Sequence, residues 1–297
     1  MDITLRSYRT TDFKLVSDFL IANHQPGNQD GNWLQPAWEY MHSHPSLDEA
    51  SLNRIGIWEH EVELVGVAHY ESRLGEAFFQ VHPDYADLKA DMLEYAEHHL
   101  CGETDDGVQY LRAYVNDFDL EFEALVRSRG YEIVARYTRP LTQFDIPQPF
   151  PPIKLAEGFG IKSLADDNNL EKIHRVLWRG FNNPGKPPRD GIEGRKKMQS
   201  GPNFRKDLTI VVEAPTGEFV SFCGMWYESV NKIAYVEPVA TDPDFRHMGL
   251  GSAAVLEGIR RCGALGATVA YVGSDQEFYK AIGFTRVFDS QCWIKQF

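Results

Sequence analysis

The stretch of the chain that decides the fold is residues 235–254, which read YVEPVATDPDFRHMGLGSAA. The pattern predicts a strand that ends near Thr241, a short Asp-Pro-Asp-Phe turn, and a glycine-containing loop that opens an amphipathic helix. Loop glycines lack a Cβ atom, so the backbone there can approach a bulky anion closely. Free N–H groups of the loop and the positive end of the helix dipole face the same point, which forms a cradle for a diphosphate without a metal ion. Arg246 adds a cationic contact at the edge of this cradle.

This stretch resembles the GNAT acyltransferase superfamily, whose most diagnostic motif is [Arg/Gln]-x-x-Gly-x-[Gly/Ala]. The motif stands here as RHMGLG at residues 246–251, and VATDPDF at 239–245 is similar to the family's strand and turn before it. A second family block, an aromatic pair ahead of Gly-Phe, stands as FYKAIGF at 278–284. The resemblance covers the second half of the chain, from 153 to 297. It implies acetyl-CoA as cosubstrate, with pantetheine lying along β-strand residues like an added strand. The residues it places against the cofactor are Val239, Ala240, Thr241, Arg246, His247, Met248, Gly249, Leu250, Gly251 and Ser252.

Two other interpretations of the loop remain open. Residues 249–254 also match the G-x-G-x-x-A pattern of dinucleotide-binding proteins, a weak signal when it stands alone. That pattern requires the first glycine directly after a strand and further βα units behind it, whereas here a turn intervenes and fewer than about fifty residues follow. The loop could also be no more than the start of a helix.

The resemblance also implies a direct transfer of the acyl group to an acceptor amine. Tyr279 takes the family's position for the general acid that protonates the departing thiolate, although a Phe-Tyr pair on a helix is often only core packing. Glu237 lies on the strand before the loop and is the candidate general base; the alternative is a surface or salt-bridged glutamate. A strand N–H at Val239 is the candidate oxyanion donor.

Two tyrosines are weaker candidates for the acceptor site. Side chains alternate along a strand, so Tyr235 is expected on the same face as Glu237. Tyr227 closes the neighbouring strand, where polar residues often simply meet water. The histidines and the four cysteines show no spacing typical of metal ligands, so no metal is expected, and scattered thiols suit a reducing, cytoplasmic location.

The two halves of the chain show the same order of elements, which predicts an internal duplication. Three pairs of segments set the register: HYE at 69–71 with WYE at 226–228, HPDY at 82–85 with DPDF at 242–245, and RGY at 129–131 with IGF at 282–284. We expect two tandem α/β (α+β) domains at 1–146 and 153–297, each a mixed, mostly antiparallel twisted sheet flanked by helices. The proline-rich segment 147–152 is the expected linker.

The first copy departs from the motif at the loop. Residues 86–91 read ADLKAD where the second copy has RHMGLG, so the basic residue and both glycines are absent. Asp91 would add a carboxylate beside a diphosphate, a repulsive contact. We therefore expect cofactor binding only in the second copy, with a structural or acceptor-pocket role for the first.

Charge and composition exclude some classes of function. Residues 1–150 carry 11 Lys/Arg and 26 Asp/Glu, a net charge of −15, which argues against a nucleic-acid partner. No apolar run is long enough to span a membrane and the first residues lack a signal-peptide pattern. The sequence therefore predicts an enzyme that acetylates a small-molecule amine, and the acidic first half favours a cationic one. The alternative is a non-catalytic sensor that binds CoA or acyl-CoA.

Overall fold

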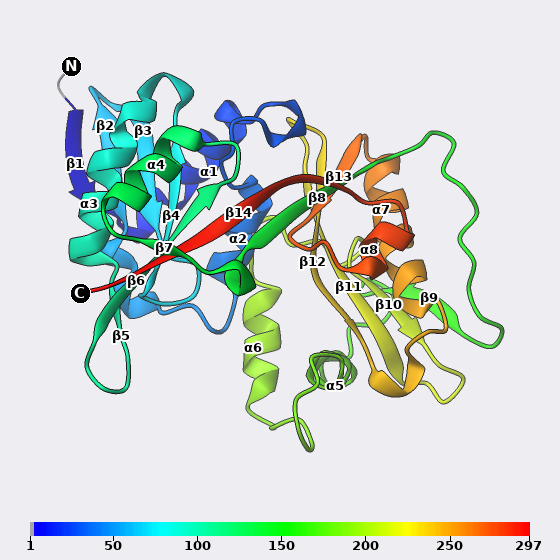
Figure 1. Cartoon of the computed structure of the whole chain (residues 1–297). Helices are drawn as coiled ribbons and strands as arrows, with labels where there is room; N and C mark the ends of the chain where they lie inside the picture. The colour runs from blue at the N-terminus through cyan, green and yellow to red at the C-terminus, as the bar shows by residue number, and fades with distance from the viewer. Residues whose placement is uncertain (1–2) are drawn as a thin grey trace. The chain divides into compact units, whose positions relative to one another are not determined.

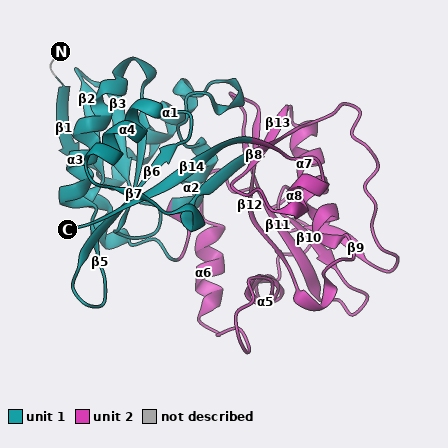
Figure 2. Cartoon of the chain, in the orientation of Figure 1, with its two compact units in different colours: residues 1–41, 46–141, 287–297 teal, residues 42–45, 142–286 magenta. Residues whose placement is uncertain are grey.

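The computed structural model describes residues 3–297, and the chain divides into two compact units (Figures 1 and 2). The first unit comprises residues 1–41, 46–141 and 287–297, and the second comprises 42–45 and 142–286. Each unit is built around one sheet, and the two sheets share the same plan.

The first unit has a mixed sheet whose strand order is β1-β2-β3-β4-β6-β14, with β5 on β6 and β7 on β14. Its strands are β1 (Ile3–Ser7), β2 (Gly56–His60), β3 (Glu63–His69), β4 (Glu76–Val81), β5 (Gly102–Glu103), β6 (Gln109–Asn116), β7 (Glu132–Ile133) and, from Val287, β14 (Thr285–Gln296). Its helices are η1 (Thr10–Asp12), α1 (Phe13–Asn23), η2 (Pro26–Asn28), α2 (Gln35–Ser43, whose last two residues fall in the second unit), η3 (Glu49–Arg54), η4 (Pro83–Leu88), α3 (Lys89–His99), α4 (Leu120–Ser128) and η5 (Ala135–Tyr137). Its strand pairs are antiparallel except β4 with β6, which run parallel and pair at only two positions.

The second unit repeats this plan with the strand order β8-β13-β12-β11-β10-β9. Its strands are β8 (Arg139–Asp145, from Thr142 onward), β9 (Gly160–Ser163), β10 (Ile210–Glu213), β11 (Phe219–Glu228), β12 (Ile233–Thr241) and β13 (Val269–Val272). Its helices are α5 (Leu170–Gly180), α6 (Gly191–Met198), η6 (Pro243–Phe245), α7 (Leu250–Ala264) and α8 (Glu277–Ala281). Here too one central pair, β12 with β13, is parallel and the rest are antiparallel.

Helices cover both faces of the second sheet. Phe222 and Cys223 are neighbours on β11, so their side chains point to opposite faces. Phe222 belongs to a core cluster with Leu177 of α5, whereas Cys223 belongs to another with Ala254 of α7. Helices α5 and α7 therefore pack on opposite faces, and the predicted fold class of mixed sheets flanked by helices is confirmed.

The units do not divide where the proline-rich segment led us to expect. Residues 147–152 contain no helix or strand, but they lie inside the second unit, where Phe150 packs against its core. Strand β8 pairs with β13 of the second unit, and β14 returns to pair with β6 of the first. Proline content identifies a segment without regular structure, but it does not tell which sheet the flanking strands join.

The residue pattern at 132–139 predicts one continuous strand. In the structure this strand is interrupted by η5 between β7 and β8, so that β8 begins only at Arg139. Pro140 is tolerated near the start of β8 because that position does not need every ladder hydrogen bond. Within residues 3–297, no helix combines the length and apolar character needed to cross a membrane.

Candidate active site

The central feature of the second unit is the place where β12 separates from β13. These parallel strands pair only from Ile233 to Tyr235 on β12, opposite Val269 to Tyr271 on β13. Beyond Tyr235, β12 has no partner strand on that side among the residues the structure describes. Its residues Val239, Ala240 and Thr241 therefore present an open backbone edge, which an extended ligand can occupy in the manner of a strand.

On its other side, β12 carries a bulge opposite β11. The register shifts so that Gly224 alone on β11 faces both Glu237 and Pro238 on β12. As a result Val236 and Val239, three residues apart, both pack against the same core cluster, whereas a regular strand would place them on opposite faces. A Cβ at Gly224 would lie 2.2 Å from the carbonyl oxygen of Glu237, so this bulge requires glycine there.

The loop after β12 exposes a run of backbone donors at the start of α7. His247 (φ 64°) and Gly249 (φ 76°) adopt left-handed backbone conformations that turn the chain into the helix. The first helical bond in this region runs from the N–H of Ala253 to the carbonyl of Gly249 at 3.0 Å. The N–H groups of residues 247–252 form no hydrogen bond with any residue in the described part of the chain.

Close packing fixes this loop against the end of β12. A Cβ at Gly251 would lie 2.9 Å from Thr241 Oγ1 and 3.3 Å from the ring of Phe278, so the helix start approaches the strand as closely as glycine allows. A Cβ at Gly249 would meet nothing within 4 Å. Glycine is therefore needed at 249 for its left-handed backbone conformation, and at 251 because a side chain would not fit between the helix start and the strand.

Arg246 holds the loop to the protein through its guanidinium group. Its Nε donates to the carbonyl of Thr241 at 3.2 Å, and its Nη2 donates to the carbonyl of Gly180 at 2.8 Å and to Asn182 Oδ1 at 2.9 Å. Gly180 ends α5, and a cation is favourable at the carboxyl end of a helix. The side chain expected at the edge of a diphosphate site thus also has a structural role.

A buried carboxylate anchors the turn before the loop. Asp242 is fully buried and accepts from Arg179 Nε at 2.7 Å and Nη2 at 2.9 Å, while Arg175 Nη1 lies 3.2 Å away. Burial by itself would raise the pKa of Asp242, but the hydrogen bonds from Arg179 and from the N–H of Asp244, with the charges of both arginines, lower it overall. The turn between β12 and the loop is therefore tied to α5 by charge.

Tyr279 lies on α8 and is buried in the same core cluster as Cys223 and Val236. Its ring stacks edge-on against Phe278 and Phe284, with centroids 4.8 and 5.5 Å apart. Burial raises its pKa, and the nearby Cys223 thiol and Glu237 carboxyl raise it further. No hydrogen bond of its hydroxyl is present among residues 3–297.

The candidate base and acid lie within electrostatic range of one another. The charge of Glu237 raises the pKa of both Tyr279 and the buried Cys223 thiol, after the larger effect of burial in each case. Glu237 and Tyr235 are both half-buried on β12. The fold thus brings Glu237 and Tyr279 together with Cys223, a residue that the sequence motifs did not indicate.

Tyr227 lies elsewhere. Its hydroxyl donates to the carbonyl of Leu265 at 2.8 Å, just beyond the end of α7. A helix of 15 residues is about 22 Å long, so Tyr227 sits at the opposite end of α7 from the loop.

The corresponding place in the first unit is built differently. Helix η4 continues directly into α3, and Leu88 and Lys89 at the junction have ordinary right-handed helical conformations. No left-handed residue opens the turn as Gly249 does, and the N–H of Lys89, which takes the place of Gly249 in the register, is already bonded to the carbonyl of Ala86. The first unit thus lacks the run of free donors seen before α7.

The chain itself also covers the edge of β4. The side chain of Asn32 accepts from the N–H of Val81 at 2.7 Å and donates to the carbonyl of Val81 at 3.1 Å. Beyond the two pairs that β4 forms with β6, Phe78 stacks on Tyr114 with ring centroids 4.4 Å apart, and Arg139 lies over both rings. Side chains of the unit thus occupy the place where the two parallel strands separate.

Residues 170–286 match the acetyltransferase (GNAT) family model. A search of curated protein sequences finds no match.

Solved structures with the same fold extend over the whole chain. A GCN5-related N-acetyltransferase from Sphaerobacter thermophilus superposes with a TM-score of 0.68 at 14% identity, covering 99% of this chain and 95% of that one. A tandem GNAT protein from the clavulanic acid biosynthesis pathway gives 0.64 at 12% identity, covering 99% and 98%. An N-myristoyltransferase from Saccharomyces cerevisiae with bound myristoyl-CoA gives 0.57 at 12% identity, covering 98% and 78%.

Proposed function

We propose that this chain, which belongs to the GNAT superfamily and has tandem domains, transfers an acetyl group from acetyl-CoA to a small-molecule amine in its second unit. The observation that carries the proposal is the run of free N–H groups at residues 247–252, beside the open edge of β12. Consecutive free donors at a helix start bind an anionic diphosphate well. An open strand edge next to them suits the amide groups of pantetheine.

In this proposal the loop binds the diphosphate of the cofactor, and the strand edge binds its pantetheine. The diphosphate is bound by the N–H groups of His247, Met248, Gly249, Leu250, Gly251 and Ser252. Pantetheine lies along Val239, Ala240 and Thr241, and the guanidinium of Arg246 keeps the loop in place. No metal takes part in this arrangement.

The chemistry is a direct transfer. Glu237 removes a proton from the acceptor ammonium, directly or through water, because only the neutral amine has a lone pair for attack. The new C–N bond forms as the thioester carbonyl becomes an oxyanion, which the N–H of Val239 stabilises at the bulge. The C–S bond then breaks, and the hydroxyl of Tyr279 gives its proton to the leaving thiolate. A raised pKa keeps that hydroxyl protonated at neutral pH. The nitrogen loses its second proton to solvent, which also returns a proton to Tyr279, and the products are the neutral amide and CoA thiol.

We further propose that the first unit binds no CoA. Support comes from the helical junction of η4 with α3, from the Asn32 side chain on the backbone of Val81, and from the stacked Phe78 and Tyr114 rings. The net charge of −15 over residues 1–150 would favour a cationic amine as acceptor. Tyr235, half-buried on β12 beside the bulge, is the candidate acceptor contact.

The test is a screen of amines for release of free thiol from acetyl-CoA by the full-length chain. We expect at least one amine to give turnover, and Tyr279→Phe to slow it while CoA binding, measured by calorimetry, stays unchanged. Tight CoA binding with no thiol release from any amine would instead indicate a sensor protein. Failure to bind CoA at all would refute the assignment of the loop.

A further inference from the structure

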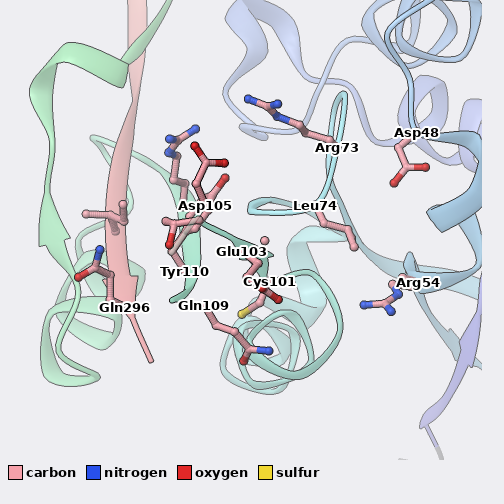
Figure 3. A pocket seen from close by; sticks show the side chains of 14 residues that line it. Asp48, Arg54, Arg73, Leu74, Cys101, Glu103, Asp105, Gln109, Tyr110 and Gln296 are labelled. Atoms are coloured by element: carbon pink, nitrogen blue, oxygen red, sulfur yellow. The ribbon is translucent and has the colours of Figure 1, made fainter. Parts of the chain in front are cut away.

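The first unit carries a pocket of about 760 Å³ that the proposed acyl transfer does not use (Figure 3). This volume lies within the range typical of sites for small molecules. Its walls come from residues 48–54, 73–74, 101–112 and 294–296, which all belong to this unit. It adjoins the start of β4, whereas η4 follows the end of that strand. The pocket is therefore separate from the place that corresponds to the cofactor loop.

The charged side chains that line this pocket are unpaired, although both signs are present. They are Asp48, Arg54, Arg73, Glu103, Asp105 and Arg112. None of the six forms a side-chain hydrogen bond or an ion pair with any residue between 3 and 297. Other arginines of the same unit do pair: Arg6 binds Asp12 and Glu59, and Arg139 binds Glu71 and Glu76.

Arg112 is held in place without a carboxylate. Its guanidinium carbon lies 5.2 Å from the ring centroid of Tyr110 and 4.6 Å from that of Tyr137. Its Nε is buried and has no acceptor in the described chain. A buried donor left without a partner costs free energy, so such a group is usually satisfied by water or a ligand.

Charges of both signs face the pocket, and Glu103 and Asp105 lie apart from Arg73 and Arg54 (Figure 3). Figure 3 shows Glu103, Asp105 and Tyr110 grouped on one side, and Arg73, Arg54 and Asp48 on the other. Burial raises the pKa of Glu76 at the start of β4, and the charges of Arg112 and Arg73 act against that rise, so both arginines lie within electrostatic range of the same carboxyl. A small molecule that carries both a positive and a negative group can form ion pairs with unpaired side chains of both signs that line one pocket.

We propose that this pocket binds a small zwitterion, with its carboxylate toward Arg73 and Arg112 and its ammonium group toward Glu103 and Asp105. Amino acids and short peptides carry these two groups. Arg73, Glu103 and Asp105 are exposed at the mouth, whereas Arg112 is half-buried. The half-buried arginine supplies the preorganised charge, and the exposed residues can adjust to the length of the ligand.

The experiment uses a series of ω-amino acids, from glycine to 8-aminooctanoate, titrated into the full-length chain without acetyl-CoA. The distance between the two charges grows by one methylene at each step. We expect affinity to pass through a maximum at one length, and the diamine and the alkanoate of that length to bind at least tenfold more weakly. No saturable binding by any member at about 10 mM, or equal binding of the alkanoate, would refute the proposal.

Variants then locate the site. Arg73→Gln and Glu103→Gln should each weaken binding of the best zwitterion at least tenfold. Both side chains are exposed and unpaired, so the fold should tolerate the changes. Lys14→Gln and Asp18→Asn, which alter an exposed ion pair on α1, are the matched controls and should bind like the wild type. Unchanged affinity in the two pocket variants would place the binding elsewhere and contradict the proposal.

Discussion

Tyr279 combines features of a core residue with those of an acid. Its ring packs between Phe278 and Phe284, yet its hydroxyl has no hydrogen-bond partner among residues 3–297 and lies near the charge of Glu237. We predict that Tyr279→Phe lowers kcat roughly 10²-fold or more, as expected for loss of a general acid. The melting temperature should change little, because the ring remains and the lost hydroxyl contributes at most about 1 kcal/mol.

Two readouts separate these roles. An unchanged kcat would make Tyr279 a packing residue, and a large drop in melting temperature would show that its hydroxyl supports the fold. With thioesters that have better leaving groups, the kcat of Tyr279→Phe should fall less, since their thiolates need less protonation by an acid as they leave. Because its pKa is raised, the wild type should keep this acid protonated up to at least about pH 10.

Asp242 offers a second prediction at the scale of one residue. Asp242→Asn removes the negative charge that Arg175 and Arg179 share in a fully buried position. We expect unfolding free energy at pH 7 to fall by about 2 kcal/mol or more, less than for a wholly buried pair because both arginines are partly exposed. Chemical denaturation measures this, with Asp18→Asn, which is exposed on α1, as the control.

The same variant predicts a pH dependence of stability. The folded pKa of Asp242 lies below its ordinary value of 3.8, so its contribution is fully present above that value and is lost as pH falls through the folded pKa. The difference in stability between wild type and Asp242→Asn should therefore shrink from pH 5 toward pH 2. A difference that stays constant over this range would show that the carboxylate charge does not hold the turn.

The sequence indicated some residues of the site but not others. Glu237, Tyr279 and the loop glycines could be proposed because they stand at fixed positions in local motifs. Gly224, Cys223 and Arg179 reach the site from β11 and α5, and no local pattern links them to residues 237–249. Only the paired register of the strands and the packing of α5 bring them there.

At the scale of elements, the loop before α7 gives the most direct test of cofactor binding. Gly249 has φ 76° and open space around its α-carbon, so Gly249→Asp adds a carboxylate without a steric clash. Its cost to folding should be about 1 kcal/mol, the penalty for a left-handed conformation. The new charge would lie at a site for an anion, so we expect CoA binding to be lost.

Gly217→Asp is the matched control for this variant. Gly217 also has a left-handed backbone conformation, φ 83°, and nothing within 4 Å of its would-be Cβ, but it lies in the turn between β10 and β11. Calorimetry should give wild-type CoA affinity for Gly217→Asp and none for Gly249→Asp, with similar melting temperatures. Equal affinity in the two variants would mean that the diphosphate lies elsewhere.

Most elements could be located from hydrophobic periodicity. The pattern predicts a helix at 13–23 and strands at 219–228 and 233–241, which are the observed bounds of α1, β11 and β12. It predicts a helix at 249–263, and the observed α7 is displaced from this range by one residue. The exceptions are β7 and β8, where an expected strand at 132–139 is split by η5 and the second part extends to Asp145. Periodicity reflects which side of a strand is buried, and it carries little information about short interrupted strands whose partners are distant in sequence.

At the scale of the whole molecule, the first unit needs a strand from a distant part of the sequence, because residues 287–297 of β14 belong to its sheet. Strand β14 pairs with β6 from Ser290 to Gln296 and places Trp293, 1% exposed, in the core of the first unit. We predict that a chain ending at Arg286 loses the cooperative unfolding of the first unit, because burial of one tryptophan alone is worth about 3–5 kcal/mol. Hydrogen exchange at β3 and β6 should rise sharply, and preserved protection there would contradict this.

The number of CoA sites is therefore best counted in the full-length chain and not in isolated halves, since residues 1–146 would lack β14. We predict one CoA bound per chain, in the second unit. There the N–H groups of residues 247–252 are free, whereas in the first unit η4 runs directly into α3 and Asn32 covers the backbone of Val81.

Calorimetry on two full-length proteins decides the matter. The wild type should titrate with a stoichiometry of one, and Gly249→Asp with none. A stoichiometry of two for the wild type, or of one remaining in Gly249→Asp, would show that the first unit binds CoA despite its filled strand edge. In that case Asn32→Ala, which frees both polar groups of Val81, should strengthen the remaining site. If one unit alone binds CoA, Asn32→Ala should leave the stoichiometry at one, because η4 still offers no run of free donors.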